Sequence, residues 1–167
     1  LDDLDLNPLF VQADPGKNKR YCEKPVINKV PDTLDQKIWP EIESLIDQNK
    51  DIVKVYDIQN TDRAVGTRIS YNLYKKFGNN NLEKDSVVVN FTGSAGQSFG
   101  AFGIKGLKLN LTGDANDYVA KGLSGATISI KLKDESNLIS NQNTIIGNTV
   151  LYGATSGKLF AAGQAGE

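Results

Sequence analysis

The fold is decided by three short apolar runs set between glycine-rich turns: Val87-Val88-Val89-Asn90-Phe91, Leu107-Lys108-Leu109-Asn110-Leu111 and Thr127-Ile128-Ser129-Ile130-Lys131-Leu132. Their centres, Val89, Leu109 and Ile130, lie 20 and 21 residues apart. Regular spacing of this size is typical of a solenoid, in which each repeat stacks on its neighbours. Two further runs, 144–146 and 150–152, continue the pattern. We therefore predict a mainly β chain in which these five runs are strands of a stacked coil.

Glycines gather in the turns between these runs. They form three sets: Gly93, Gly96, Gly100, Gly103 and Gly106; Gly113, Gly122 and Gly125; and Gly147, Gly153, Gly157, Gly163 and Gly166. Glycine is favoured where φ is positive or where two strands approach too closely for a side chain, so we interpret these positions as corners of the coil. The alternative is a phosphate-binding loop at residues 93–98. It is the weaker interpretation, because the sequence has no Gly-Lys-Ser/Thr tripeptide and another strand, not a helix, follows.

Two helices are predicted upstream of the runs. The first follows Asp32 or Thr33, either of which suits a helix N-cap. Its apolar face consists of Leu34, Ile38, Ile42, Leu45 and Ile46. Because Pro40 interrupts this face, we expect a short first turn to end at Trp39 and the main helix to begin with Pro40.

The second helix is predicted to begin at the capping cluster 60–62 and to end before Gly78, where a left-handed residue commonly closes a helix. Its apolar side chains recur every fourth residue: Val65, Ile69, Leu73 and Phe77. Arg63 and Arg68 are placed on this helix as ordinary surface residues.

The segments before each helix are predicted to be extended. Residues 1–31 alternate apolar and acidic side chains at their start and are then punctuated by prolines, which is typical of a lead-in that packs along another surface. Residues 51–58 are predicted as a short, half-buried strand carrying Val53 and Val55.

Composition excludes several classes of site. Nineteen basic and twenty acidic residues leave a net charge of −1, which gives no electrostatic footprint for nucleic acid or anionic lipid. Histidine is absent, which removes Ser-His-Asp and Cys-His catalysis. Cys22 is the only cysteine, so it forms no zinc site or intrachain disulfide, and we interpret it as inert. The basic cluster 17–20 is interpreted as a solvated loop.

Sequence length and termini support further expectations. No apolar run approaches the roughly 18 to 20 residues of a membrane span. Methionine is absent even at position 1, so we expect a processed product or an excised fragment.

Asp114 and Asp117 are the acidic pair with the clearest alternative chemistry. Two carboxylates suit a glycosidase, and carboxylate oxygens suit calcium. However, Asp and Asn in a glycine-led turn commonly bond to nearby backbone and tolerate left-handed conformations, so we favour a structural role.

Four long motifs occur in order along the chain: QNTDRAVGTR at 59–68, NFTGSAGQSFG at 90–100, GDANDYVAKGLSG at 113–125 and GNTVLYGATSG at 147–157. They closely resemble the C-terminal GXGXG domain of the glutamate synthase large subunit. The opening LDDLDLNPL at 1–9 resembles that family's connection out of its FMN-binding barrel, and is most similar to ferredoxin-dependent forms.

The resemblance implies a right-handed parallel β-helix with a structural, interdomain-bracing role. It implies division into an extended linker (1–31), a helical and strand lead-in (32–85) and a glycine-repeat β-helix (86–167) that is truncated at its C-terminal end. The parent enzyme makes L-glutamate from glutamine and 2-oxoglutarate in the cytoplasm or plastid stroma, using FMN and an iron–sulfur cluster. None of its catalytic, cofactor-binding or metal-binding elements matches a residue of this chain.

The partners implied by the resemblance are the FMN barrel and the amidotransferase domain, with no nucleic acid and no membrane. An uncapped last coil would also expose a strand edge, so the chain alone is expected to be marginally stable or to self-associate through its C-terminal end. Two alternatives stay open: a stand-alone protein resembling the β-helical subunit of formylmethanofuran dehydrogenase, and a β-helical carbohydrate-active enzyme using Asp114 and Asp117.

Overall fold

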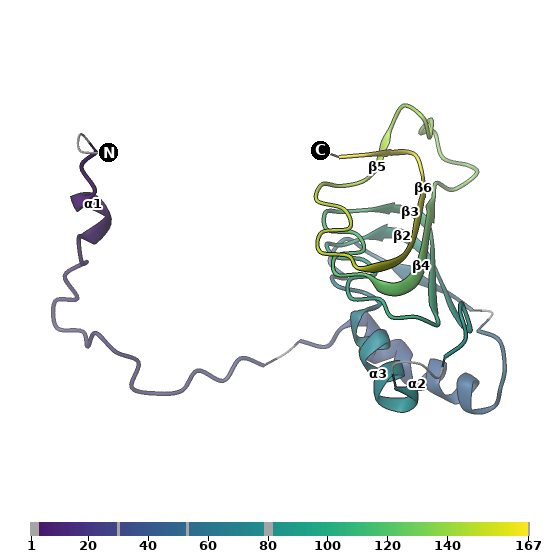
Figure 1. Ribbon diagram of the computed structural model, residues 1–167, viewed down its shortest axis with the longest axis horizontal. Helices are drawn as coiled ribbons and strands as arrows, with labels where there is room; N and C mark the ends of the chain where they lie inside the picture. Colours follow the sequence, from purple (N-terminus) through teal and green to yellow (C-terminus); the bar gives the residue numbers. More distant parts are fainter. Residues whose placement is uncertain (1–3, 30, 53, 79–81, 167) are drawn as a thin grey trace. The chain divides into compact units, whose positions relative to one another are not determined.

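The computed structural model describes residues 4–29, 31–52, 54–78 and 82–166 (Figure 1). The chain divides into two units, Leu1–Pro31 and Asp32–Glu167, and each is described by itself. In the first unit, α1 (Asn7–Phe10) is a single helical turn, and the other described residues are extended or in turns. The predicted alternation of the lead-in begins at Leu1 to Asp3, which lie outside the described residues.

The second unit is built on a parallel sheet with the strand order β1-β2-β3-β4-β6, while β5 pairs with β3 and β7. The strands are β1 (Val55–Ile58), β2 (Val87–Ala95), β3 (Leu107–Ala115), β4 (Ser124–Lys131), β5 (Thr144–Ile146), β6 (Ser156–Ala162) and β7 (Gln164–Ala165). Every pairing between them is parallel. The chain is therefore mainly parallel sheet with few helices, which confirms the predicted class at this level.

The register of the middle strands follows the predicted spacing at its first step and differs at its second. Val89 pairs with Leu109, 20 residues on, as predicted. Leu109 then pairs with Ile128 rather than Ile130, so the second step is 19 residues rather than 21. Ile128 and Ile130 both point into the core, and a two-residue shift keeps the same side chains inside. The apolar pattern alone therefore does not distinguish the two registers.

A twelve-residue insertion interrupts the fourth coil. The offset between β3 and the strand that follows it rises from 19 residues at Leu109↔Ile128 to 31 at Ala115↔Ile146. Residues 132–143 leave the sheet between these two pairings, and Figure 1 shows them projecting from the stack. The chain then returns as β5, which confirms the predicted strand at 144–146.

The prediction of a strand at 150–152 is wrong. These residues form a turn, and Leu151 has a positive φ of 60°, which a strand does not accommodate. The strand that follows β5 is instead β6, at Ser156–Ala162.

Alternating side chains of the middle strands form the core of this unit. The buried side chains are Val87, Val89 and Phe91 of β2, Leu107, Leu109 and Leu111 of β3, and Ile128 and Ile130 of β4. The Phe91 ring meets Phe99 edge-on at a centroid distance of 5.7 Å. Each fully buried side chain of this kind contributes roughly 1.5 to 3 kcal/mol, so the sheet is held mainly by this column.

The first long helix, α2 (Leu34–Asp47), is continuous through Pro40, so the predicted break at Trp39 is wrong. Thr33 caps it as predicted: its side chain accepts the Gln36 N–H, and the Gln36 side chain accepts the Thr33 N–H. Proline inside a helix costs about 3 kcal/mol or more. Here the capping box before Pro40 and the burial of Ile38 and Ile42 on both sides of it oppose that cost.

The second long helix, α3 (Thr67–Phe77), begins later than predicted and ends where predicted. Gly66 is its N-cap, and Gly78, with a φ of 73°, closes it. The Asp62 carboxylate instead accepts the Gln59 N–H and closes a local turn. Arg63 therefore lies before the helix, not on it.

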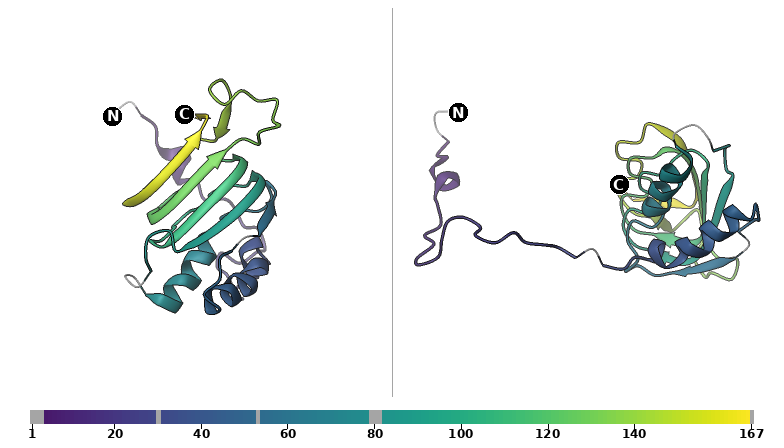
Figure 2. Two further views of the ribbon diagram at one scale, coloured as in Figure 1. Left: turned by 90° about the vertical axis from the view of Figure 1, so that its right-hand side faces the viewer. Right: turned by 90° about the horizontal axis from the view of Figure 1, so that it is seen from below.

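Strand β1 is half-buried, as predicted for this segment. Tyr56 and Ile58 are buried, whereas Val55 is 53% exposed. Val53 lies outside the described residues. Figure 2 shows α2 and α3 side by side at the end of the sheet away from β6.

Within the described ranges, no helix is long and apolar enough to cross a membrane.

Candidate functional site

The most regular feature of the second unit is a column of four stacked turns, here called the corner stack. It comprises residues 59–66, 96–103, 116–123 and 147–155, which follow β1, β2, β3 and β5. The second and third corners have the same internal hydrogen bonding, with overlapping turns in each. In the second corner the Ala101 N–H donates to Ser98 O, and in the third corner the Lys121 N–H donates to Tyr118 O. Alternate residues in the last three corners have positive φ: Ser98, Gly100 and Phe102; Tyr118, Ala120 and Gly122; Thr149, Leu151 and Gly153.

Hydrogen bonds run through the corner stack from one coil to the next. The donors Ala64, Ser98 and Tyr118 bond to the carbonyls of Gln97, Asp117 and Asn148 at 2.8, 2.9 and 2.9 Å. Non-glycine residues with positive φ are strained by about 1 to 2 kcal/mol each, and such strain persists where the surrounding structure fixes it. The bonds between coils supply that constraint.

The glycine-rich stretch 93–98 serves this stacking rather than forming a phosphate cradle. Gly93 lies in β2, and a Cβ placed on Gly113 would lie only 1.8 Å from the Gly93 carbonyl oxygen. The Gly96 N–H donates to Asp62 O, and the Ser98 N–H donates to Asp117 O. These N–H groups are already used between coils, which supports the interpretation of Gly96 as a corner. Gly93 and Gly113 lie within strands, so the prediction that they are corners is wrong, and close approach of the strands explains them instead.

Asp114 and Asp117 both make hydrogen bonds between coils. The Ser94 hydroxyl donates to Asp114 at 3.0 Å, and the Asn148 N–H donates to Asp117 at 2.8 Å. The predicted structural role is therefore supported, although the bonds reach 20 and 31 residues along the sequence rather than to adjacent backbone. Asp114 also lines a cavity of about 300 Å³ between the strands and the 132–143 insertion.

A buried carboxylate that sequence reasoning missed joins the two helices. Asp35, in the first turn of α2, is 2% exposed and accepts the N–H groups of Gly66, Arg68 and Ile69 at the start of α3. Burial raises the pKa of Asp35, while these three N–H donors oppose the rise. In the sequence it looks like an ordinary first-turn acidic residue of its own helix, so no local signal distinguished it.

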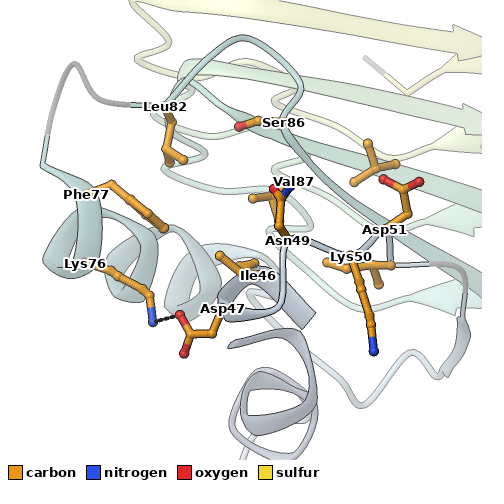
Figure 3. Close-up of a pocket in the computed structure, with 12 residues that line it drawn as sticks. Ile46, Asp47, Asn49, Lys50, Asp51, Lys76, Phe77, Leu82, Ser86 and Val87 are labelled. Atoms are coloured by element: carbon orange, nitrogen blue, oxygen red, sulfur yellow. Dashed lines mark ion pairs between the residues drawn. The ribbon is translucent and has the colours of Figure 1, made fainter. Parts of the chain in front are cut away.

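A cavity of about 550 Å³ lies between the C-terminal ends of α2 and α3 and the start of β2 (Figure 3). Ile46, Phe77 and Leu82 are among its apolar lining residues. Lys76 also lines it, 2.6 Å from Asp47, and hydrogen bonding to that carboxylate raises the pKa of Lys76. The cavity thus combines an apolar lining with a lysine that is already paired.

The remaining residues considered from sequence lie apart from these features. Lys19 pairs with Glu23, and Arg20 donates to the Gln12 side chain, as expected of a solvated loop. Cys22 is exposed, and its thiol donates to the Lys24 carbonyl. Among the described residues, no three His, Cys, Asp or Glu side chains are grouped so that they could hold a metal ion.

Comparisons with known proteins identify the family of the second unit and relatives of the whole chain. The family model described as the GXGXG motif matches residues 35–167. The large chain of NADPH glutamate synthase from Azospirillum brasilense is 54% identical over 167 residues, which cover 100% of this chain and 11% of that protein. NADH glutamate synthase from Saccharomyces cerevisiae is 47% identical, covering 98% of this chain and 8% of that protein.

Ferredoxin-dependent glutamate synthase 2 from Synechocystis is 43% identical over 98% of this chain and 11% of its own length. The chain thus spans about a tenth of the length of these relatives. The names of these relatives give NADPH, NADH and ferredoxin, so the comparisons do not single out the predicted ferredoxin-dependent type. They favour neither the formylmethanofuran dehydrogenase alternative nor the carbohydrate-active one.

Proposed function

Because the chain belongs to the GXGXG family, we propose that it is the bracing domain of a glutamate synthase large chain. The observation that carries this proposal is similarity over 98 to 100% of the chain to glutamate synthases from three organisms. The activity of the whole enzyme would be formation of L-glutamate from glutamine and 2-oxoglutarate. This segment would supply no catalytic residue to it.

The finer fold we propose is a right-handed parallel β-helix over 86–167, preceded by the linker 1–31 and the helical and strand region 32–85. The parallel pairing and the bonds through the corner stack support this architecture. A rigid coil with outward-facing apolar side chains suits bracing, and Phe102 and Tyr152 are exposed on the second and fourth corners. The partners would be the FMN barrel and the amidotransferase domain, in the cytoplasm or the plastid stroma.

FMN and an iron–sulfur cluster belong to the proposed parent enzyme, and the residues of this chain do not fit either group. An iron–sulfur cluster is held by several cysteine thiolates, whereas Cys22 is the only cysteine. The N–H groups of Gly96 and Ser98, which resembled a phosphate cradle, donate to neighbouring coils. We therefore assign no cofactor contact to this segment.

Self-association of the isolated chain is part of the proposal. Strand β6 ends the main strand order, and its Phe160 side chain is 56% exposed. An open strand edge of this kind pairs readily with another chain. Sedimentation velocity over a range of concentrations tests this: a single monomeric species at every concentration would contradict it.

The test of function uses the full-length polypeptide that contains this chain. Purified protein should form glutamate from glutamine and 2-oxoglutarate when a reduced electron donor is supplied. Asp114→Asn and Asp117→Asn should retain most of that activity once thermal unfolding shows them folded, with the exposed Asn141→Ala as the matched control. A wild-type protein that forms no glutamate would refute the proposed enzyme. A folded Asp117→Asn protein without activity would refute the non-catalytic role.

A further inference from the structure

The lead-in, residues 4–29, carries a large share of the chain's exposed apolar side chains. They are Leu4, Leu6, Leu9, Phe10, Val11, Tyr21, Val26 and Ile27. None of the described residues of this segment is buried, and the most exposed, Ile27, has 86% of its surface free. Concentrated apolar exposure without a core marks an interaction surface.

The composition of the lead-in differs from that of a flexible linker. Flexible linkers are rich in glycine and serine, whereas residues 1–31 contain a single glycine, Gly16, and no serine. Four prolines (Pro8, Pro15, Pro25 and Pro31) restrict the backbone, which reduces the entropy that docking would cost. Similarity to the Azospirillum large chain includes this segment, although the family model begins only at residue 35.

Basic side chains are confined to the second half of the lead-in, where they are interspersed with the exposed Tyr21, Val26 and Ile27. Residues 4–11 hold five of the exposed apolar side chains and one charged residue, Asp5. Residues 17–29 hold five basic side chains and one acidic one, Glu23, which is paired with Lys19. The complementary surface is therefore an apolar groove that continues into an acidic region.

We propose that residues 4–29, including the helical turn α1, dock along such a groove on another folded domain of the same polypeptide. Residues 4–11 occupy its apolar part, and residues 17–29 lie along its acidic part. The lead-in is then an interaction segment that fixes the second unit against its neighbour. This inference rests on the proposed function, which supplies further domains in the polypeptide.

Hydrogen exchange measured by mass spectrometry on the full-length polypeptide and on the 167-residue chain tests the proposal. In the full-length protein, amides of residues 4–29 should exchange at least about 100-fold more slowly than in the chain alone, because a docked segment exchanges only when it opens. Equally fast exchange in both would overturn the proposal. Protection of residues 4–29 in the 167-residue chain alone would also overturn the proposal. This holds whether that protection is independent of protein concentration or depends on concentration because the segment binds a second copy.

Paired variants separate the two parts of the segment. Leu9→Ser with Phe10→Ser, and Lys19→Glu with Arg20→Glu, should each speed exchange of the lead-in in the full-length protein by about tenfold or more. Asn18→Ser with Asn28→Ser is the matched control and should leave exchange unchanged. If the control pair loosens the segment as much as the test pairs do, the assigned contacts are wrong.

Glutamate formation by the same wild-type sample separates the two proposals. An active enzyme with an unprotected lead-in refutes only the docking. An inactive wild-type enzyme with a protected lead-in refutes the proposed function and leaves docking supported.

Discussion

The carboxylate of Asp35 lies against the backbone of Gly66, with both of its oxygens 3.0 Å from the Gly66 nitrogen. The same carboxylate accepts the N–H groups of Arg68 and Ile69. The first N–H groups of a helix have no partner within it, so a side chain from α2 satisfies the start of α3. This contact joins two helices through residues that are 31 to 34 positions apart.

Removing this carboxylate should destabilise the second unit. Asp35→Ala leaves three N–H groups without an acceptor, of which those of Gly66 and Ile69 are buried. Hydrogen bonds to charged groups contribute roughly 1.5 to 3 kcal/mol, so we expect the free energy of unfolding to fall by about 2 to 3 kcal/mol. Urea unfolding of the 167-residue chain measures it. Asp134→Ala, which removes a carboxylate that is 88% exposed, is the control and should change stability by less than about 0.5 kcal/mol. Similar losses in both variants would contradict the role given to Asp35.

The Asp35 contact also predicts a pH dependence. Burial raises the pKa of Asp35 above its ordinary value of 3.8, so the folded protein holds this proton more tightly than the unfolded chain. The associated stability is fully present below the unfolded value and is lost as pH rises through the folded pKa. The stability of the wild type relative to Asp35→Asn should therefore fall as pH rises above the ordinary value of 3.8. A difference that widens with pH would show that the three N–H donors outweigh burial.

Two glycines separate the effect of close packing from that of backbone conformation. Gly113 has a φ of 150°, and a Cβ there would lie 1.8 Å from Gly93 O, whereas Gly153 has a φ of 68° and open space around it. Gly153→Ala should cost only the backbone strain, about 1 to 2 kcal/mol. Gly113→Ala adds a clash with backbone and should cost at least about 4 kcal/mol, a value reached by few substitutions. Equal losses in thermal unfolding would refute close approach as the reason for Gly113.

The sheet was predictable from sequence where its pattern is local. Alternation in 87–91 and 107–111, with a 20-residue offset, predicted the pairing of Val89 with Leu109. The glycine corners were predictable for the same reason, since positive φ and close approach both restrict the residue type. The predicted strand at Val150 to Tyr152 was wrong, because an apolar run in a corner has the same composition as one in a strand.

Contacts between distant segments could not be predicted. Asp35 is a good first-turn residue for its own helix, and nothing near it indicates that it bonds to Gly66. The bonds of Asp114 to Ser94 and of Asp117 to Asn148 depend likewise on which coils become neighbours. The predicted helix start at Pro40 was wrong for a different reason: the local preference of proline for a helix start was overridden by the packing of Ile38 and Ile42.

Between Lys131 and Ile146 the fourth coil carries twelve residues more than the repeat requires, and the register shows how to remove them. Lys131 pairs with Thr112, so Leu132 follows in the column that Gly93 and Gly113 occupy in the preceding coils. The next paired residue of the fourth coil is Ile146, opposite Ala115. Deleting residues 133–144 joins Leu132 to Ile145 and gives the fourth coil a uniform 19-residue offset from β3.

We expect this deletion to be tolerated when it is combined with Leu132→Gly. The shortened coil then has glycine in the column where Gly93 and Gly113 have φ values of 130° and 150°, so its backbone can approach the neighbouring coil. Shortening a surface loop changes its closure entropy only slightly, but this variant also loses the buried Leu132 side chain and the pairing of Thr144 with Gln164, so we expect the free energy of unfolding to fall by about 2 to 5 kcal/mol. The same deletion with Leu132 retained should be less stable, because a leucine at that φ is strained by about 1 to 2 kcal/mol and has no space beside the carbonyl of Gly113. Thermal unfolding and circular dichroism of the two deletion proteins compare them directly. If the leucine form is the more stable one, residue 132 does not belong to the glycine column.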